Sequence, residues 1–486
     1  MSAANQAFLF DNLGPRRVQA DFSGGTLSTD AGALLLRQVD IHLGLTAELA
    51  QCFDDARHPL WVDHSLQELL RQRLFGTALG YEDINDHQRL RLDPLLAAAC
   101  GKTDPLGQNR FLPQFRGIAL AAPSTLNRLE LSNNKNTRCH KLPHDPAKVQ
   151  ACLLKMGARC LPKHAREVVV DLDAMGHRLH GFQEGRHFNA YYDDYCYLPL
   201  YAFVGDFPLW AQLRTADHDA AHGVVPALEQ IVAAIRKRCP QARIIVRGDS
   251  GFCREEIMAW CERQREVYYC LGLAKNSVLI GKLGPALAQA RARMCLSGAA
   301  SVREFTEFMY RTQDSWSRER RVIGKAEILR EGENPRFVVT NLPAAGFPEE
   351  RKRKLKKQKS PSRFAPAPLY EELYCARGDM ENKLKQQVLD LQADRMSTQY
   401  LASNQFRLWE AMFAYLLLER LRTQGLSGTE LERATAGSLR LKLLKIAAQV
   451  RVSVRRVYVQ MSSAFPLQEV FALCHRRLMR LAAPAG

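Results

Sequence analysis

The sequence predicts an α/β protein in which a mixed sheet occupies the middle of the chain and helical regions flank it. Apolar residues recur at helical spacing through most of residues 1–165. Short β-branched runs then alternate with amphipathic stretches over residues 166–275, and helical spacing returns from residue 369. Alternating patterns between these parts predict a β-rich insertion over residues 276–345.

Residues 1–165 are expected to form a helical N-terminal region. Residues 30–44 and 64–80 carry apolar side chains at intervals of three and four positions, which is typical of helices that bury one face. Residues 123–132 predict a short polar helix with Ser124 as its N-cap. This helix is interpreted either as a surface packing helix or as a recognition helix.

Residues 166–275 are expected to hold the first part of the α/β core. The pattern predicts three strands, a helix, a strand, a helix and a strand, at residues 167–176, 195–205, 208–216, 224–239, 242–251, 254–264 and 267–274. Three meandering strands followed by alternating helices and strands are typical of the ribonuclease H fold, not of a doubly wound parallel fold. In that topology the first and fourth strands are neighbours.

Acidic residues are expected at one edge of this sheet. Asp171 and Asp173 share a face of the first strand, because side chains alternate along a strand. Asp249 follows the fourth strand in the sequence IIVRGDSGF, between Gly248 and Gly251. The glycines either leave room for a ligand to approach Asp249 or simply form a tight turn.

A third acid, Glu381, lies in the strongly helical residues 370–391 and shares a helix face with Tyr374 and Arg377. Clustered carboxylates repel one another and therefore call for a cation. Oxygen ligands favour Mg²⁺, with Mn²⁺ as a substitute. Two such ions, about 3.5–4 Å apart, would activate an attacking oxygen and stabilise a leaving one.

Three further segments complete the chain. They are a basic loop at residues 346–368, closing helices of the core at residues 369–425 and a basic C-terminal region at residues 426–486. Seven basic residues of the loop fall within residues 351–359, a pattern that indicates a solvated loop, a grip on phosphates, or both.

Net charge is the most informative bulk property. Lys and Arg total 68 against 51 Asp and Glu, which gives +17 and indicates a polyanionic partner, nucleic acid before membrane. No apolar run is long enough to span a bilayer, and the first residues do not resemble a secretory signal. The 13 cysteines form no C-x-x-C pair and are interpreted as reduced thiols of a cytoplasmic protein.

Taken together, these motifs make the chain resemble a DDE transposase of bacterial insertion sequences. The resemblance spans roughly residues 27–466 and rests on VVVDLDA, EGRHFNAYYDDYCYLPLY, RGDSGF, DSWSRERR, LYCARGDMEN and SLRLKLLKI. It implies that Asp173, Asp249 and Glu381 bind the metals, with Asp171 as the alternative to Asp173. Met175 stands where the family usually has Thr, which leaves the choice between Asp171 and Asp173 open.

The same resemblance, together with the basic patches, gives a set of expected DNA contacts. They are Tyr374, Arg377, Lys385, Trp316, Arg247, Arg440, Lys442 and Lys445. Trp316 would either stack on an extruded base or pack the core of the insertion. Lys385 would substitute for a family lysine whose position is held here by Val388. Arg440, Lys442 and Lys445 would contact the DNA backbone or remain solvated on a packing helix.

The expected function is cut-and-paste DNA transposition by a nucleoid-associated bacterial enzyme. The helical N-terminal region, residues 1–165, would be a DNA-binding region. The protein would bind terminal inverted repeats and target DNA as double strands, act as a homodimer on DNA, and cleave and join strands with two Mg²⁺ ions. One alternative is a metal-dependent DNA nuclease of the same fold without strand transfer. Another is a non-catalytic DNA-binding relic of a transposase.

Overall fold

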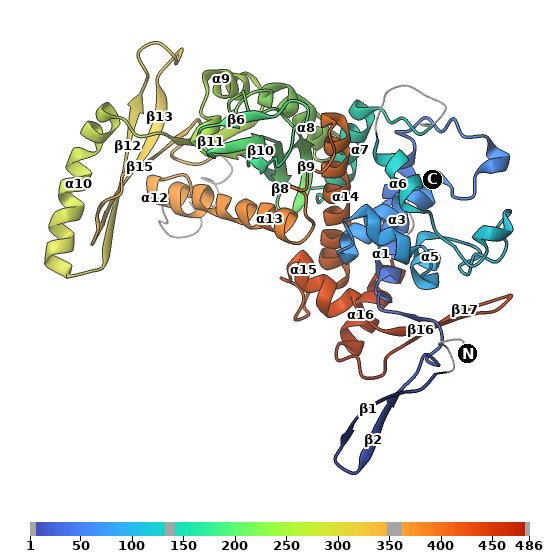
Figure 1. Ribbon diagram of the computed structural model, residues 1–486. Coiled ribbons are helices and arrows are strands. Elements are labelled where there is room, and N and C mark those ends of the chain that lie inside the picture. The colour runs from blue at the N-terminus through green and yellow to red at the C-terminus, as the bar shows by residue number, and fades with distance from the viewer. Residues whose placement is uncertain (1–5, 132–140, 348–361, 482–486) are drawn as a thin grey trace. The chain divides into compact units, whose positions relative to one another are not determined.

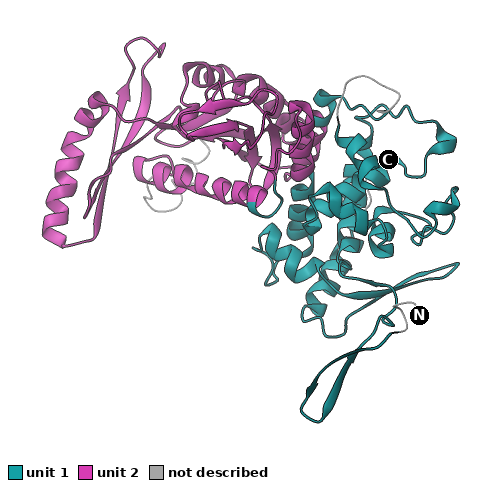
Figure 2. Cartoon of the chain, in the orientation of Figure 1, with its two compact units in different colours: residues 1–149, 389–392, 413–486 teal, residues 150–388, 393–412 magenta. Residues whose placement is uncertain are grey.

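The computed structural model describes residues 6–131, 141–347 and 362–481 (Figure 1). The chain divides into two compact units, each assembled from distant parts of the sequence (Figure 2). Unit 1 comprises residues 1–149, 389–392 and 413–486, and unit 2 comprises residues 150–388 and 393–412. The run of basic residues at 351–359 lies outside the described residues.

Unit 2 is built on a nine-stranded mixed sheet with the order β12-β13-β15-β11-β10-β4-β8-β9, and β14 pairs with β13. At its centre β4 (Glu167–Ala174), β10 (Arg243–Gly248) and β11 (Val267–Leu273) run parallel. β8 (Leu200–Val204) and β9 (Phe207–Gln212) continue the sheet as antiparallel strands. The first and fourth predicted strands are therefore neighbours, and the predicted α/β class with a mixed sheet is confirmed.

Helices cover both faces of this sheet. α8 (Val224–Arg238) and α9 (Glu255–Arg263) lie on one side, and α13 (Gly378–Leu389) lies on the other (Figure 1). Val168, Val170 and Leu172 of β4 belong to the core on the α8 and α9 side. Asp171 and Asp173 alternate with these residues and therefore belong to the face that carries α13.

Pro199 divides a segment that the sequence predicts as one strand over residues 195–205. β7 (Asp194–Tyr197) joins β5 (His177–Arg178) and β6 (His187–Asn189) in a small separate sheet, whereas β8 joins the main sheet. Because proline has no N–H to donate, it interrupts a strand ladder. The single predicted strand is thus corrected to two.

The segment expected to be a β-rich insertion begins with a long helix, which corrects that expectation. α10 (Ser277–Ser297) starts at Asn276, whose side chain accepts a hydrogen bond from the N–H of Leu279 at 2.9 Å. Leu279, Leu283 and Leu287 recur every four residues and are buried, so one apolar stripe seats the helix.

The strands after α10 extend the main sheet. They are β12 (Ser301–Tyr310), β13 (Arg320–Leu329), β14 (Gly332–Glu333) and β15 (Arg336–Thr340). β15 pairs antiparallel with β11, and β13 pairs with both β12 and β15. The α/β core and the segment inserted into it therefore share one continuous sheet.

Unit 1 is mainly helical. Its helices include α1 (Ala33–Leu43), α2 (Leu45–Ala50), α3 (Leu66–Leu79), α4 (His87–Leu90), α5 (Pro94–Cys100), α6 (Pro123–Glu130) and α16 (Gln468–Met479). α3 begins with a capping box, in which the Ser65 side chain accepts from the Glu68 N–H and the Glu68 side chain accepts from the Ser65 N–H. Among the described residues, no helix is long and apolar enough to cross a membrane.

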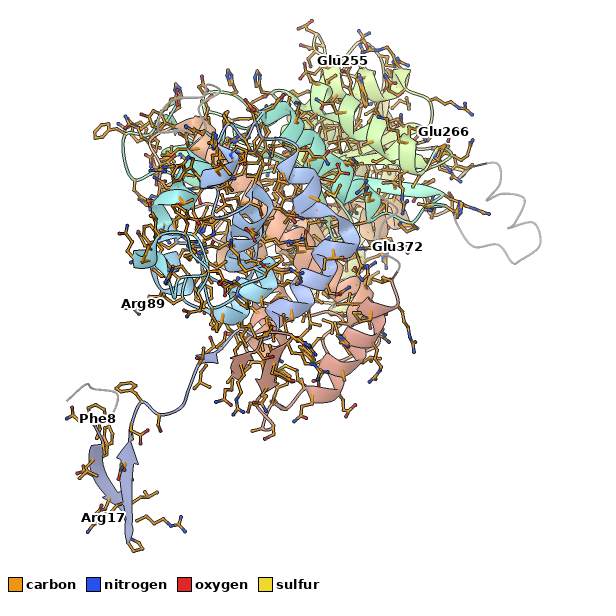
Figure 3. The ribbon with its side chains drawn as sticks, turned by 90° about the vertical axis from the view of Figure 1, so that its right-hand side faces the viewer. Phe8, Arg17, Arg89, Glu255, Glu266 and Glu372 are labelled. Carbon is orange, nitrogen blue, oxygen red and sulfur yellow. The ribbon has the colours of Figure 1, made fainter. Side chains whose placement is uncertain are left out.

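Strands at both ends of the sequence also belong to unit 1, and the N-terminal region expected to be helical begins with three of them. β1 (Phe8–Leu13) and β2 (Arg16–Ala20) form a hairpin whose side chains are largely exposed (Figure 3). β3 (Leu27–Ser28) pairs with β16 (Ala448–Val452), which pairs in turn with β17 (Val457–Met461). The N-terminal and C-terminal regions therefore complete one small sheet.

Candidate functional site

Two of the predicted acids lie together where the parallel strands β4 and β10 end. Arg247 of β10 is level with Asp171 of β4, so Asp249, two positions further, follows at the level of Asp173. Asp173 is 9% exposed and Asp249 is partly buried. The sheet register alone thus positions both carboxylates at one edge of the sheet.

Asp249 also forms the turn that follows its strand. Its side chain caps the short helix η5 (Ser250–Phe252) and accepts a hydrogen bond from the Gly251 N–H at 2.8 Å. A Cβ on Gly248 would lie 3.0 Å from the Phe252 ring. Gly248 therefore leaves room for the Phe252 ring, while the turn itself is closed by the Asp249 side chain.

The pKa of Asp173 is affected by the other two acids. Burial raises its pKa to about 6, the Arg377 guanidinium opposes this rise, and the negative charges of Asp249 and Glu381 add to it. The raised pKa of Asp173 therefore reflects its burial first and the two neighbouring carboxylates last, and positive charge at the site lowers it.

Arg377 provides part of that charge. Its Nη2 lies 2.7 Å from Oε1 of Glu381, and its Nη1 lies 3.5 Å from Oδ2 of Asp173. The sequence predicts one regular helix face here, but the backbone passes from a π-helical turn, η6 (Leu369–Tyr374), through η7 (Cys375–Arg377) into α13. This irregular start directs Arg377 towards both acids.

The donor set suits a hard divalent cation, because all its ligand atoms are carboxylate oxygens. Within the described residues, however, no three His, Cys, Asp or Glu side chains approach closely enough to hold one metal ion. The positive charge between Asp173 and Glu381 is supplied by the Arg377 guanidinium, where a metal ion would otherwise supply it. Metal binding at this site would therefore replace at least part of the Arg377 contact, with Asp173, Asp249 and Glu381 as the ligands.

Asp171, the alternative first ligand, forms a buried ion pair with Arg247. Arg247 Nε lies 2.5 Å from its Oδ1 and Nη2 lies 2.7 Å from its Oδ2, and both residues are at most 6% exposed. Arg247 also donates to the carbonyl oxygen of Leu373 at 2.5 Å. The geometry therefore favours Asp173 as the ligand, and the expectation that Arg247 contacts DNA is revised to a structural role.

Gly272 of β11 is a site residue that sequence reasoning missed. A Cβ at this position would lie 2.5 Å from the Tyr374 Oη, 2.9 Å from the Ser250 N and 3.1 Å from the Asp249 carbonyl carbon. Burial raises the pKa of Tyr374 to about 12, so its hydroxyl stays protonated near neutral pH. A glycine inside an apolar strand pattern indicates that another group lies close to the backbone, and Gly272 lies in such a pattern.

Trp316 packs within the segment that follows α10. It is 5% exposed, its ring lies 5.5 Å from that of Tyr310, and the Arg320 guanidinium lies over it at 5.5 Å. Arg320 in turn pairs with Glu255 at 2.6 Å and Glu262 at 2.7 Å. In this conformation Trp316 supports the local core, the second of the two roles considered for it.

The basic side chains that are expected to contact DNA are either exposed or bound to other residues of the protein. Lys385 and Lys442 are exposed. Arg440 donates to the carbonyl oxygens of Ala78 and Asp390. Lys445 binds Asp30 at 2.6 Å and the Tyr81 hydroxyl at 2.8 Å. Arg440 and Lys445 therefore have partners within unit 1, and contact of these basic side chains with DNA stays a prediction.

Comparison with known protein families gives one match that spans nearly the whole chain. Residues 10–483 match the family described as transposase DDE domain group 1. Among solved structures, a piggyBac transposase synaptic complex with hairpin DNA is similar at 10% identity and a TM-score of 0.39, over 86% of this chain and 80% of the other. No curated protein sequence matches the chain.

Proposed function

The chain belongs to the transposase DDE domain group 1 family, and we propose that it moves an insertion sequence by metal-dependent cleavage and strand transfer at terminal inverted repeats. Family membership makes it a DNA transposase, an enzyme of phosphoryl transfer on DNA, and such enzymes generally use divalent metal ions. The observation that supports the proposal is that Arg377 contacts both Asp173 and Glu381, while Asp249 is near enough to Asp173 to raise its pKa.

In this proposal Asp173, Asp249 and Glu381 hold two Mg²⁺ ions, with Mn²⁺ as a substitute. When bound, these ions stabilise charge on the phosphate and lower the pKa of the attacking water. Arg377, displaced from the acids, donates to phosphate oxygens of the element end. The protonated Tyr374 hydroxyl donates a second hydrogen bond from the same side.

Water cleavage at the element boundary would leave a 3′-OH, which then attacks target DNA in line. The exposed Lys385 and Lys442 would add backbone contacts whose strength falls with salt. We further propose that two copies act together on DNA, one at each end of the element, in the cytoplasm of a bacterium at its nucleoid.

A cleavage assay on a labelled duplex that carries the element's terminal repeats tests this proposal. We expect the wild type with Mg²⁺ to cut at the repeat boundary and to join the 3′ end to target DNA. Asp173→Asn, Asp249→Asn and Glu381→Gln should bind the duplex without cutting it. Glu372→Gln, a matched change at an exposed glutamate of the same segment, should cut like the wild type.

Each other outcome removes part of the proposal. Equal cutting by all variants would exclude the acid cluster as the catalytic site. Cutting without joined products would indicate a nuclease in place of a transposase. Binding without cutting by the wild type would indicate a DNA-binding relic.

A further inference from the structure

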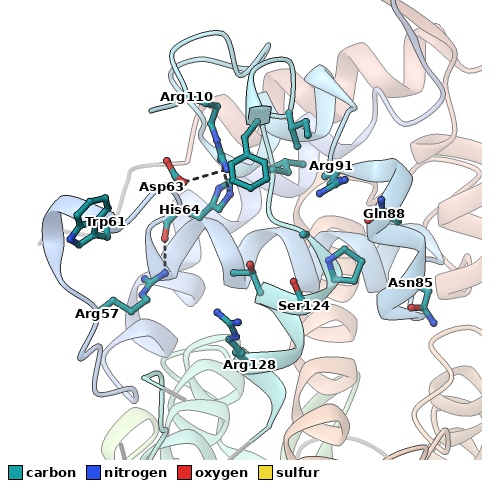
Figure 4. Close-up of a pocket in the computed structure, with 16 residues that line it drawn as sticks. Arg57, Trp61, Asp63, His64, Asn85, Gln88, Arg91, Arg110, Ser124 and Arg128 are labelled. Atoms are coloured by element: carbon teal, nitrogen blue, oxygen red, sulfur yellow. Dashed lines mark hydrogen bonds and ion pairs between the residues drawn. The ribbon is translucent and has the colours of Figure 1, made fainter. Parts of the chain in front are cut away.

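Unit 1 contains a basic cavity of about 910 Å³ that the proposed catalytic site does not use (Figure 4). Four arginines surround it: Arg57, Arg91, Arg110 and Arg128. A second cavity, of about 360 Å³, shares Arg57 and Arg128 and adds Lys141. The two cavities therefore adjoin at Arg57 and Arg128, and both are lined by basic residues of unit 1.

The positive charge of this cavity is only partly compensated. Arg57 pairs with Asp55 at 2.6 Å and Arg110 pairs with Asp63 at 3.4 Å. Within the described parts of the chain, neither Arg91 nor Arg128 has a carboxylate partner. The Nε atoms of Arg91 and Arg110 are buried and have no hydrogen-bond acceptor there. Buried donors of this kind are normally satisfied, so these point to an acceptor that binds from outside.

His64 adds another donor. Burial, with the nearby charges of Lys102, Arg110 and Arg57, lowers its pKa to about 2, so the ring is neutral. Its Nε2 lies 2.8 Å from Nη1 of Arg110, and arginine can only donate, so Nε2 accepts and the proton is on Nδ1. That Nδ1 is buried without a partner, and the His64 side chain is 7% exposed.

The start of α6 contributes to the same wall. Pro123, Ser124 and Thr125 line the cavity. The N-cap is Ala122, not Ser124 as the sequence predicts, and it has no side-chain acceptor. Pro123 has no N–H and the Thr125 N–H donates to the Ala122 carbonyl oxygen at 2.9 Å, so among the described residues the Ser124 N–H is the one of these three positions without a backbone acceptor. Such groups carry partial positive charge and bind anions. Uncompensated arginines, an orphaned histidine donor and an uncapped helix start therefore all favour an anionic ligand.

An aromatic rim distinguishes this cavity from a plain phosphate site. Trp61 lines the cavity yet is 72% exposed, and its ring meets that of Phe111, which is 73% exposed, edge to face at 5.9 Å. Asn85 and Gln88 also line the cavity. Exposed aromatic rings stack on unpaired bases, and side-chain amides bind base edges.

We propose that this cavity binds an unpaired nucleotide of DNA, with its phosphate held by Arg91, Arg128 and the start of α6 and its base stacked on Trp61. A base inside a duplex has both faces covered by its neighbours and cannot stack on Trp61. The cavity also has the size of known small-ligand sites, about 300–1,000 Å³, which accommodates a single nucleotide. The identity of the partner as DNA rests on the proposed function, whereas the binding site itself lies in unit 1, outside the acid cluster of unit 2.

Tryptophan fluorescence tests this proposal directly. The chain has five tryptophans, and Trp210, Trp260, Trp316 and Trp409 are each at most 5% exposed. Trp61 is therefore the one that a bound base would quench. We expect a short single-stranded oligodeoxynucleotide, titrated in EDTA, to quench the emission, and a blunt duplex of the same sequence to quench it far less.

Variants separate the parts of the site. Trp61→Ala should remove the quenching and weaken single-strand binding, measured by anisotropy, by about tenfold, the lower part of the range for loss of one stacked base. Arg91→Gln combined with Arg128→Gln should reduce the slope of log affinity against log salt by about 2 or somewhat less. Arg89→Gln, at the exposed Arg89 outside the cavity, should weaken binding far less (Figure 3).

Equal quenching by duplex and single strand, or equal losses in Arg89→Gln and the double variant, would overturn the proposal. Quenching by poly-glutamate but not by the oligonucleotide would also overturn it, in favour of an acidic protein partner. Because EDTA prevents metal-dependent cutting, failure here leaves the cleavage assay unaffected, and loss of cleavage in Asp249→Asn leaves this binding intact.

Discussion

Replacing Arg247 by Met should be among the most destabilising changes in unit 2. The substitution removes the two contacts to Asp171, at 2.5 and 2.7 Å, and the one to the Leu373 carbonyl. Asp171 is 3% exposed, and burial already raises its pKa with Arg247 in place. Removing one partner of such a pair leaves a buried charge uncompensated, which costs about 3–5 kcal/mol.

Thermal unfolding of unit 2 measures this loss. For a unit of this size about 1 kcal/mol lowers Tm by about 2–4 °C, so Arg247→Met should lower it by roughly 10 °C. Asp171→Asn combined with Arg247→Met leaves no buried charge and should recover part of that loss. The coupling between the two changes should be at least about 1 kcal/mol. Additive effects of the two single changes would refute the buried-pair explanation.

Three further predictions concern packing and pH. Gly272→Ala should lower stability by about 1–3 kcal/mol and reduce cleavage, because the new Cβ would meet the Tyr374 Oη at 2.5 Å. Gly281→Ala lies within α10, where nothing is within 4 Å of the new Cβ, and is the control: it should leave cleavage unchanged and raise stability by up to about 1 kcal/mol, because Ala favours a helix over Gly. Trp316→Ala should lower stability by about 3–5 kcal/mol, since the ring is 5% exposed; unchanged Tm with weakened DNA binding would instead indicate base stacking. Burial lowers the pKa of His87 to about 3, so the unfolded chain, with a His pKa near 6.5, binds more protons between these values. Stability should therefore fall as pH drops below about 6.5, by up to about 1.4 kcal/mol per pH unit, and thermal scans of His87→Asn should show a shallower fall.

Local patterns predicted much of the sheet. β-branched runs predicted β4, β10 and β11, and side-chain alternation placed Asp171 and Asp173 on one face of β4. Two local errors have local causes. Pro199 divides a predicted strand. The leucine stripe that seats α10 lies within residues 276–345, which the alternating patterns further along predict to be β-rich.

Long-range contacts account for the rest. The pairing of β3 with β16 joins residues from opposite ends of the chain. Alternating residues predict a strand near β16, but nothing in the sequence indicates its partner. The same is true of the Arg247 contacts, which turn an apparent DNA-binding arginine into a buried partner of Asp171. The cavity around Arg91 and Arg128 likewise depends on tertiary structure, although the short polar helix α6 at its wall was predicted from the sequence.

Mapping the metal site by Fe²⁺-mediated backbone cleavage tests the central claim most directly. Fe²⁺ replaces Mg²⁺ at oxygen ligands, and with ascorbate and oxygen it cuts the chain next to where it binds. Our account predicts cuts near Asp173, Asp249 and Glu381 in the wild type, suppressed by excess Mg²⁺ and lost in Asp249→Asn. Cuts elsewhere in the chain, or the same cuts in Asp249→Asn, would contradict it.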